Sequence, residues 1–126
     1  VCTTSTHDMT PLRNWWKEDP EKTQRYYNHV LQRIGEAPDE CTAEIVAQII
    51  SNHLKTRSML TIIPLQDWFA MDDSIKQKDI ESERINVPAN STHYWRYRMH
   101  ITLEQLLQAD NLNNKIVSLI KEAGRK

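Results

Sequence analysis

Two short strand-like runs, separated by a long helical stretch, constrain the fold of this 126-residue chain more than any other feature. Val1–Thr6 is rich in β-branched residues and predicts a short strand that runs into His7 and Asp8. Met59–Ile63 is an almost continuous apolar run closed by Pro64, which is typical of a strand buried on both faces. Strands separated by helices pair in parallel, but two strands cannot form a sheet with both faces buried. The pattern predicts a slice of a larger, helix-rich α/β fold, with Met59–Ile63 exposed on at least one side in the chain alone.

Helix-start signals recur along the rest of the chain. They predict helices that begin after caps at Thr10 (with Pro11 as the first helical residue), Asp19 and Thr102. They also predict a helix from about Thr42, a last helix that starts at Asp110 or Asn111, and a helical run over Leu65–Met71. An apolar stripe over Tyr26–Ile34 predicts a helix closed by Gly35, and the clearest stripe comprises Ile45, Val46, Ile49, Ile50 and Leu54. Asp79–His100 has no periodicity and predicts a long irregular loop, a feature that is usually functional. The charged residues of Asp72–Arg84 predict a solvated surface of mixed sign.

The composition excludes several classes of function. A net charge of −1, from 16 Lys+Arg against 17 Asp+Glu, argues against a general nucleic-acid binder. No apolar run approaches about 18 residues, so we expect no membrane span. Only 2 residues are Gly, where average usage of ~7% would give about 9, which excludes a Gly-rich phosphate loop. Cys2 and Cys41 are too few for a disulfide framework or a zinc site and predict two free thiols in a reducing compartment, while the histidines lack metal-ligand spacing. We therefore expect neither a metal nor a cofactor.

His7 and Asp8 are the first candidate site residues. They follow the first predicted strand, and α/β folds place their active sites at the carboxyl ends of strands. A carboxylate there can orient a substrate hydroxyl or stabilise a developing cation, and a neighbouring histidine can donate a hydrogen bond. The alternative is that Asp8 caps the helix that begins near Thr10, and the local sequence alone favours this cap.

The aromatic and basic run His93–Arg98 is the second candidate. Aromatic rings interleaved with arginine can stack on sugars, bind single-stranded nucleic acid, or pack over a core. The local sequence favours packing over a core, and the near-neutral net charge argues against binding of nucleic acid. Trp15 and Trp16 follow a helix start and are predicted to be core residues.

Five fragments together resemble one known family. In chain order they are Thr4–Thr10, Trp15–Trp16, Leu65–Asp67, Glu83–Pro88 and His93–Arg98. Together they are similar to the carboxy-terminal part of the 4-α-glucanotransferases, also known as the amylomaltase or disproportionating-enzyme family. The double Trp and the aromatic-basic run resemble the larger branch of this family.

The resemblance implies a (β/α)₈ TIM barrel, of which residues 1–126 form the last two strand–helix units and not a complete barrel. It implies a cytoplasmic enzyme that cleaves α-1,4-glucan and passes a glucosyl or maltooligosyl unit to another sugar with retention. The implied partners are α-1,4-glucan, maltooligosaccharides and the remainder of the barrel, with no nucleic acid, membrane or cofactor.

The resemblance also assigns roles to four residues. Asp8 matches a carboxylate that grips the sugar and stabilises an oxocarbenium-like transition state, and His7 matches the histidine beside it. Asn86 matches a substrate-contacting asparagine, and Trp95 is carried over as part of the loop that covers the substrate. Retaining chemistry needs a nucleophile and an acid/base about 5 Å apart, and the family places both before Val1. We therefore expect the isolated chain to be inactive.

Two other classes of function remain open at this stage. One is a helical interaction module whose exposed run Met59–Ile63 docks into a partner chain. The other is a single-strand nucleic-acid binder that uses the aromatic and basic residues Tyr94–Arg98.

Overall fold

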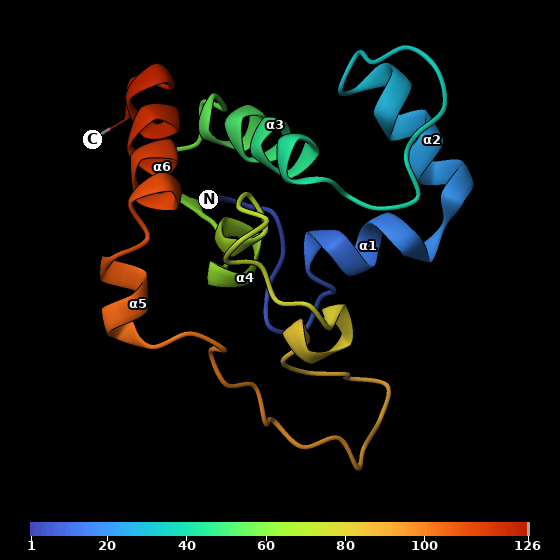
Figure 1. Cartoon of the computed structure of the whole chain (residues 1–126). Helices are drawn as coiled ribbons and strands as arrows, with labels where there is room; N and C mark the ends of the chain where they lie inside the picture. Colours follow the sequence, from blue (N-terminus) through green and yellow to red (C-terminus); the bar gives the residue numbers. More distant parts are fainter. Residues whose placement is uncertain (126) are drawn as a thin grey trace.

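The computed structural model describes residues 1–125 as two short strands and the helices that follow each of them (Figure 1). The first unit comprises β1 Cys2–Thr3, α1 Leu12–Glu18, α2 Pro20–His29 and α3 Ala43–Leu54. The second comprises β2 Thr61–Ile62, α4 Leu65–Phe69, the 3₁₀ helix η1 Ile80–Glu83, α5 Leu103–Leu107 and α6 Asp110–Glu122. This order matches the predicted alternation of strands and helices.

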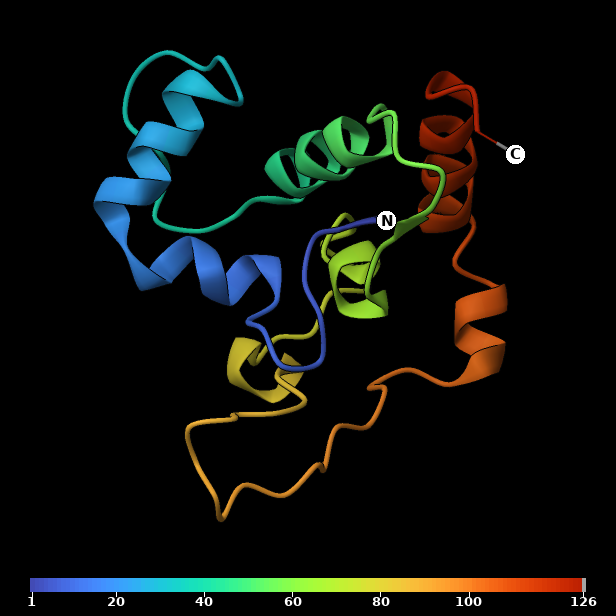
Figure 2. The same ribbon diagram turned by 180° about the vertical axis from the view of Figure 1, so that it is seen from behind.

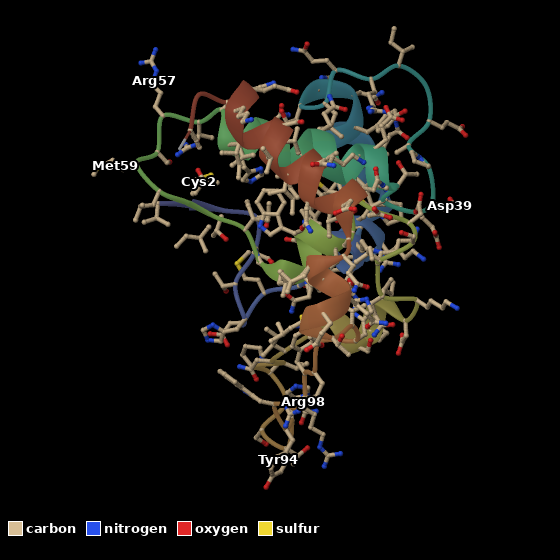
Figure 3. The ribbon with its side chains drawn as sticks, turned by 60° about the vertical axis from the view of Figure 1, so that its left-hand side comes forward. Cys2, Asp39, Arg57, Met59, Tyr94 and Arg98 are labelled. Carbon is tan, nitrogen blue, oxygen red and sulfur yellow. The ribbon has the colours of Figure 1, made fainter. Side chains whose placement is uncertain are left out.

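The two strands pair in parallel, which confirms the predicted pairing. Their register places Cys2 opposite Thr61 and Thr3 opposite Ile62. The outer side of the sheet is open: Met59 is 94% exposed and projects from the edge of the molecule (Figure 3), and Ile62 is 59% exposed. The run that is typical of a strand buried on both faces is thus open on one side in this chain, because no segment within residues 1–125 covers that side. The expectation that one side is exposed is confirmed.

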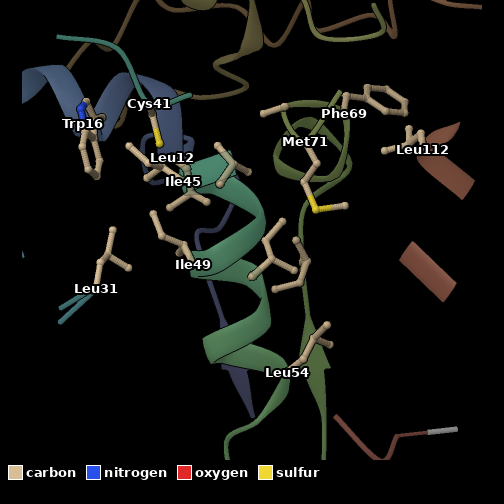
Figure 4. Close-up of a cluster of buried hydrophobic side chains, with 14 residues drawn as sticks. Leu12, Trp16, Leu31, Cys41, Ile45, Ile49, Leu54, Phe69, Met71 and Leu112 are labelled. Carbon is tan, nitrogen blue, oxygen red and sulfur yellow. The ribbon is translucent and has the colours of Figure 1, made fainter. Parts of the chain in front are cut away.

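Helix α3 forms the centre of the hydrophobic core (Figure 4). All five residues of its predicted stripe are buried: Ile45, Val46, Ile49, Ile50 and Leu54. They join a cluster that includes Leu12 and Trp16 of α1, Phe69 of α4 and Leu112 of α6. Burial of one such side chain stabilises the folded state by about 1.5–3 kcal/mol relative to the same side chain left in water. The five buried side chains therefore make α3 a major source of the stability of this fold. The core role predicted for Trp16 is confirmed.

A buried carboxylate joins the first strand, α1 and α4. The Asp67 side chain accepts hydrogen bonds from the Leu12 backbone N–H at 3.0 Å and from the Thr4 hydroxyl at 2.6 Å. Burial raises the pKa of Asp67, and the hydrogen bonds from Thr4 and Leu12 oppose that rise because they stabilise the charged form. Asp67 therefore supplies the hydrogen-bond acceptor at the start of α1 from a distant part of the chain.

The cap predicted at Thr10 is wrong. Helix α1 begins at Leu12 with Pro11 in the cap position and without a cap from a neighbouring side chain, while the Thr10 hydroxyl bonds to Glu18 instead. The cap predicted at Asp19 is confirmed, and Thr102 and Gln105 form the predicted capping box. The helix predicted from about Thr42 is α3, and the Thr42 side chain caps it.

The helix predicted over Tyr26–Ile34 is shorter than expected. Helix α2 ends at His29, and Ile34 beyond it is 98% exposed. The Asn28 side chain donates to the carbonyls of Arg33 and Gly35 at 2.8 and 3.2 Å, and Gln32 takes a left-handed backbone conformation. These bonds turn the chain back on α2, so Gly35 does not close the helix.

The predicted irregular loop is confirmed in its main part. Apart from η1, residues 79–100 contain no helix or strand. Residues 84–101, which we name the site loop, extend away from α2 and α3 at the opposite end of the molecule in both views (Figures 1 and 2).

Candidate functional site

His7 and Asp8 lie in a tight turn a few residues beyond the end of β1 at Thr3. The Met9 N–H donates to the Thr6 carbonyl at 3.0 Å, and the Asp8 N–H lies 3.4 Å from the Thr6 hydroxyl. The side chains of His7 and Asp8 are 53% and 52% exposed, with the His7 Nε2 atom 3.4 Å from Asp8 Oδ2. The turn thus presents a half-exposed carboxylate beside an imidazole.

Asn86 from the site loop contacts both residues of this turn. Its side-chain amide donates to Asp8 Oδ1 at 2.6 Å, and its backbone N–H donates to the His7 carbonyl at 3.1 Å. Two hydrogen bonds, one from the side chain and one from the backbone, fix the register between segments that lie 78 residues apart. The carboxylate of Asp8 is engaged by Asn86 and not by the start of α1, so the alternative that Asp8 caps α1 is wrong.

Trp95 of the site loop lies against His7. Its ring lies 5.2 Å from the His7 ring, centroid to centroid, at an interplanar angle of 50°, while the side chain remains 58% exposed. The structure therefore brings the four predicted site residues together: His7, Asp8, Asn86 and Trp95. Their chemical roles remain predictions.

A buried ion pair joins the segment after Asp8 to the segment before Asn86, and the sequence analysis missed it. Arg13 Nη1 lies 2.9 Å from Glu83 Oε1, and the two side chains are 9% and 2% exposed. Burial raises the pKa of Glu83 to about 7, although the Arg13 charge acts in the opposite direction. The prediction that Asp72–Arg84 is a solvated surface is therefore wrong at Glu83, and it is also wrong at Asp72, which is buried and bonded to Asn111.

Only weak signals in the sequence point to this pair. Arg13 lies between the buried residues Leu12 and Trp16 on α1, and Glu83 directly precedes the segment of Asn86. Charged residues are rarely buried without a partner, and the partner here is 70 residues away. A single sequence holds no information that pairs them.

The distal part of the site loop is largely exposed. Tyr94, labelled near the tip of the loop with Arg98 in Figure 3, is 74% exposed, and the Arg96 guanidinium lies 5.6 Å from its ring centroid. Tyr94 and Trp95 thus do not pack over the core, which overturns the packing interpretation for these two rings. Tyr97 is partly buried, and burial raises the pKa of its hydroxyl.

The histidines, cysteines and acidic residues of residues 1–125 form no group of three or more that could hold a metal ion. Both cysteines, Cys2 and Cys41, are free thiols. Among the described helices, none is long and apolar enough to cross a membrane.

The site can accept and orient hydroxyl groups. The exposed part of the Asp8 carboxylate can accept hydrogen bonds or stabilise positive charge, while Asn86 restricts its rotation. The His7 imidazole lies beside this carboxylate, and the Trp95 ring lies against the imidazole. Two parallel strands, each followed by helices, are compatible with part of an α/β domain. The candidate residues lie in loops that follow these strands, and such domains bind their ligands at that end of the sheet.

The particular family follows from comparison with known proteins. The family model for 4-alpha-glucanotransferases matches residues 1–104, and the chain belongs to this family. It is 39% identical over 125 residues to the 4-alpha-glucanotransferase DPE2 of rice (Oryza sativa subsp. japonica), with 99% of this chain and 13% of that protein covered. It is 30% identical over 122 residues to the 4-alpha-glucanotransferase of Chlamydia trachomatis serovar D, with 94% of this chain and 22% of that protein covered.

A lower similarity extends to rice 4-alpha-glucanotransferase DPE1, a chloroplastic/amyloplastic protein, with 27% identity over 99 residues. The chain spans only 13% and 22% of the lengths of the rice DPE2 and chlamydial relatives. No solved structure matches the chain.

Proposed function

We propose that this chain is the carboxy-terminal part of the catalytic (β/α)₈ barrel of a 4-α-glucanotransferase. The complete protein would transfer glucosyl or maltooligosyl units between α-1,4-glucans and maltooligosaccharides with retention. The contact of Asn86 with Asp8, within a chain that belongs to this family, is the observation that carries the proposal.

The exposed apolar side of the strand pair supports the proposal that this chain is part of a barrel. β1 and β2 are parallel, each is followed by helices, and the apolar residues Met59 and Ile62 face outward. A (β/α)₈ barrel needs ~250 residues, and the relatives are several times longer than this chain. The remainder of the barrel is the partner that would cover the open side of this strand pair.

We assign Asp8 to stabilisation of the positive charge that develops on the sugar ring. Its half-exposed carboxylate is held by Asn86 and flanked by His7, so it needs little reorganisation when charge develops. Asn86 and Trp95 would bind the substrate from the site loop. The nucleophile and the acid/base would come from the rest of the barrel, because retaining chemistry needs a second pair of carboxylates about 5 Å apart.

The proposed substrate is uncharged, and the proposed reaction needs no cofactor. The net charge of −1 suits a neutral glucan better than nucleic acid. Free thiols at Cys2 and Cys41 are consistent with a reducing compartment, and we propose a cytoplasmic location for the enzyme.

The proposal is tested by maltotriose disproportionation, with release of glucose as the readout. In the full-length protein, Asp8→Asn should lower kcat about 100-fold or more, because a preorganised charge is lost from the transition state. The control is Asp39→Asn, an exposed aspartate on the connection between α2 and α3, which should leave kcat unchanged. Near-normal turnover of the Asp8→Asn protein would contradict the role of Asp8.

The isolated chain provides a second test. Residues 1–126 alone should release no glucose from maltotriose, whereas the full-length protein should. Glucose release by the isolated chain would overturn the assignment of the nucleophile and the acid/base to the missing part.

A further inference from the structure

We propose that the buried Arg13–Glu83 ion pair sets the position of Asn86 against Asp8, so that Arg13 and Glu83 are positioning residues of the site. This inference rests on the proposed function, since it concerns the same group of side chains. Neither residue contacts the four site residues through a hydrogen bond, and both act through the segments that carry them.

The ion pair and the site contact join the same two segments. Arg13 lies five residues after Asp8, and Glu83 lies three residues before Asn86. Three residues of extended chain span at most about 10 Å, so a fixed Glu83 leaves Asn86 only a short tether. The pair thus brings the start of the site loop to the start of α1, and Asn86 then meets the turn of His7 and Asp8.

Further bonds hold both partners of the pair in place. Arg13 Nη1 also donates to the Gln77 carbonyl at 2.6 Å, and the Gln66 side chain donates to the Glu83 carbonyl at 3.1 Å. Beyond the pair, Arg84 Nε donates to the Asn86 carbonyl at 3.1 Å. Side chains of α1 and α4 therefore grip the chain on the amino-terminal side of Asn86, where the irregular site loop begins.

Burial distinguishes this pair from the ion pairs on the surface. An exposed pair between flexible side chains contributes little and does not fix geometry. Removal of one partner from a buried pair leaves the other charge without compensation, and the surrounding structure must rearrange. Glu83 already has one oxygen, Oε2, that is buried without a hydrogen-bond partner, so Arg13 is its main compensation. Loss of Arg13 or Glu83 should therefore displace the segment that carries Asn86.

The test is a double-mutant cycle in the full-length protein, with maltotriose disproportionation as the readout. Glu83→Ala should lower kcat about tenfold when Asn86 is present, because small misplacements of a positioned group have large effects on rate. In an Asn86→Ala background, the same substitution should change kcat less than twofold, since the group that it positions is already absent. KM and the melting temperature are measured for all four proteins, so that a general loss of folded protein is recognised.

Two further variants keep the test decisive. If Glu83→Ala fails to fold, Glu83→Met takes its place, because it keeps the length of the side chain and removes both the charge and the acceptor. The matched control is Glu44→Gln, which breaks the 2.6 Å ion pair with Arg33 on the exposed side of α3 and should leave kcat unchanged in both backgrounds.

Each outcome bears on the proposal. An equal loss of kcat with and without Asn86, or no loss with Asn86 present, would overturn the positioning role. If Asp8→Asn and Asn86→Ala themselves leave kcat unchanged, the proposed function fails first. If they lower kcat and the cycle is additive, only the positioning role fails.

Discussion

The helical body and the site loop of this molecule are stabilised in different ways. The helical body, which comprises α1, α2, α3, α4 and α6 with their short connections, encloses a continuous apolar core around α3. The site loop, residues 84–101, is held by a few individual hydrogen bonds, such as those of Asn86 and that of His93 with the Ile85 carbonyl. Its apolar residues Met99 and Ile101 reach the core only near its end.

Because of this difference, we expect the helical body to determine stability and the site loop to determine function. Loss of a side chain in the helical body removes many packing contacts at once and lowers the free energy of unfolding. Loss of a side chain in the site loop removes one or two contacts and leaves the core intact, but it alters what Asp8 faces. We therefore expect variants of the body to change stability and variants of the loop to change activity.

The largest expected effect is in the body. Ile50→Ala removes a fully buried side chain of α3 and should lower the free energy of unfolding of the domain that contains this chain by about 2–5 kcal/mol. Ile34→Ala is the matched control, since the same residue type is 98% exposed there, and it should cost less than about 0.5 kcal/mol. Urea unfolding measures both. Equal destabilisation by the two substitutions would remove the distinction between core and surface.

The pattern of the body could be predicted because its information is local. The five stripe residues of α3 recur at helical spacing, so the sequence alone predicts both the helix and the face that it buries. The end of α2 could not be predicted, because the apolar spacing continues through Ile34 while the side chain of Asn28 turns the backbone away. Competition between periodicity and side-chain hydrogen bonds is decided only in three dimensions.

The site was predictable in part and for a different reason. His7 and Asp8 follow a recognisable strand, and the family resemblance assigned Asn86 to the same substrate, but nothing in the sequence predicted the contact of Asn86 with Asp8 across 78 residues. The pair of Arg13 and Glu83 was missed because an ionised residue is expected at the surface, and nothing local reveals that tertiary contacts bury both. Long-range polar contacts are thus the part of this fold that a single sequence conceals.

The next largest expected effect is on stability, at Glu83, which lies between the helical body and the site loop. This effect depends on pH. The pKa of Glu83 is about 7 in the folded chain against an ordinary value of 4.5, so the folded state binds this proton more tightly than the unfolded state. Its contribution to stability is full below about pH 4.5 and is lost as the pH rises through 7, by at most about 3 kcal/mol. Glu83→Gln mimics the protonated form and should gain stability relative to the wild type from pH 5 to pH 8.

Melting temperatures of the full-length wild type and the Glu83→Gln protein at both pH values check this difference. Glu44→Gln, whose carboxylate lies at the surface, should show no such trend. A difference in melting temperature between wild type and Glu83→Gln that stays constant across this range would mean that Glu83 is ionised throughout. Its pair with Arg13 would then behave like an ion pair on the surface.

The smallest expected effect is at the distal part of the site loop. Trp95→Ala removes the ring contact with His7 and should lower kcat/KM for maltotriose about two- to tenfold, since an aromatic pair contributes about 0.5–1.5 kcal/mol. The neighbouring Tyr94→Ala is the control, because Tyr94 is 74% exposed and its ring lies against Arg96. Both substitutions should lower the melting temperature far less than Ile50→Ala, since neither ring belongs to the core. A larger loss of kcat/KM for Tyr94→Ala than for Trp95→Ala would show that the loop meets the substrate through its outer face, and the group around His7 would then have to be redrawn without Trp95.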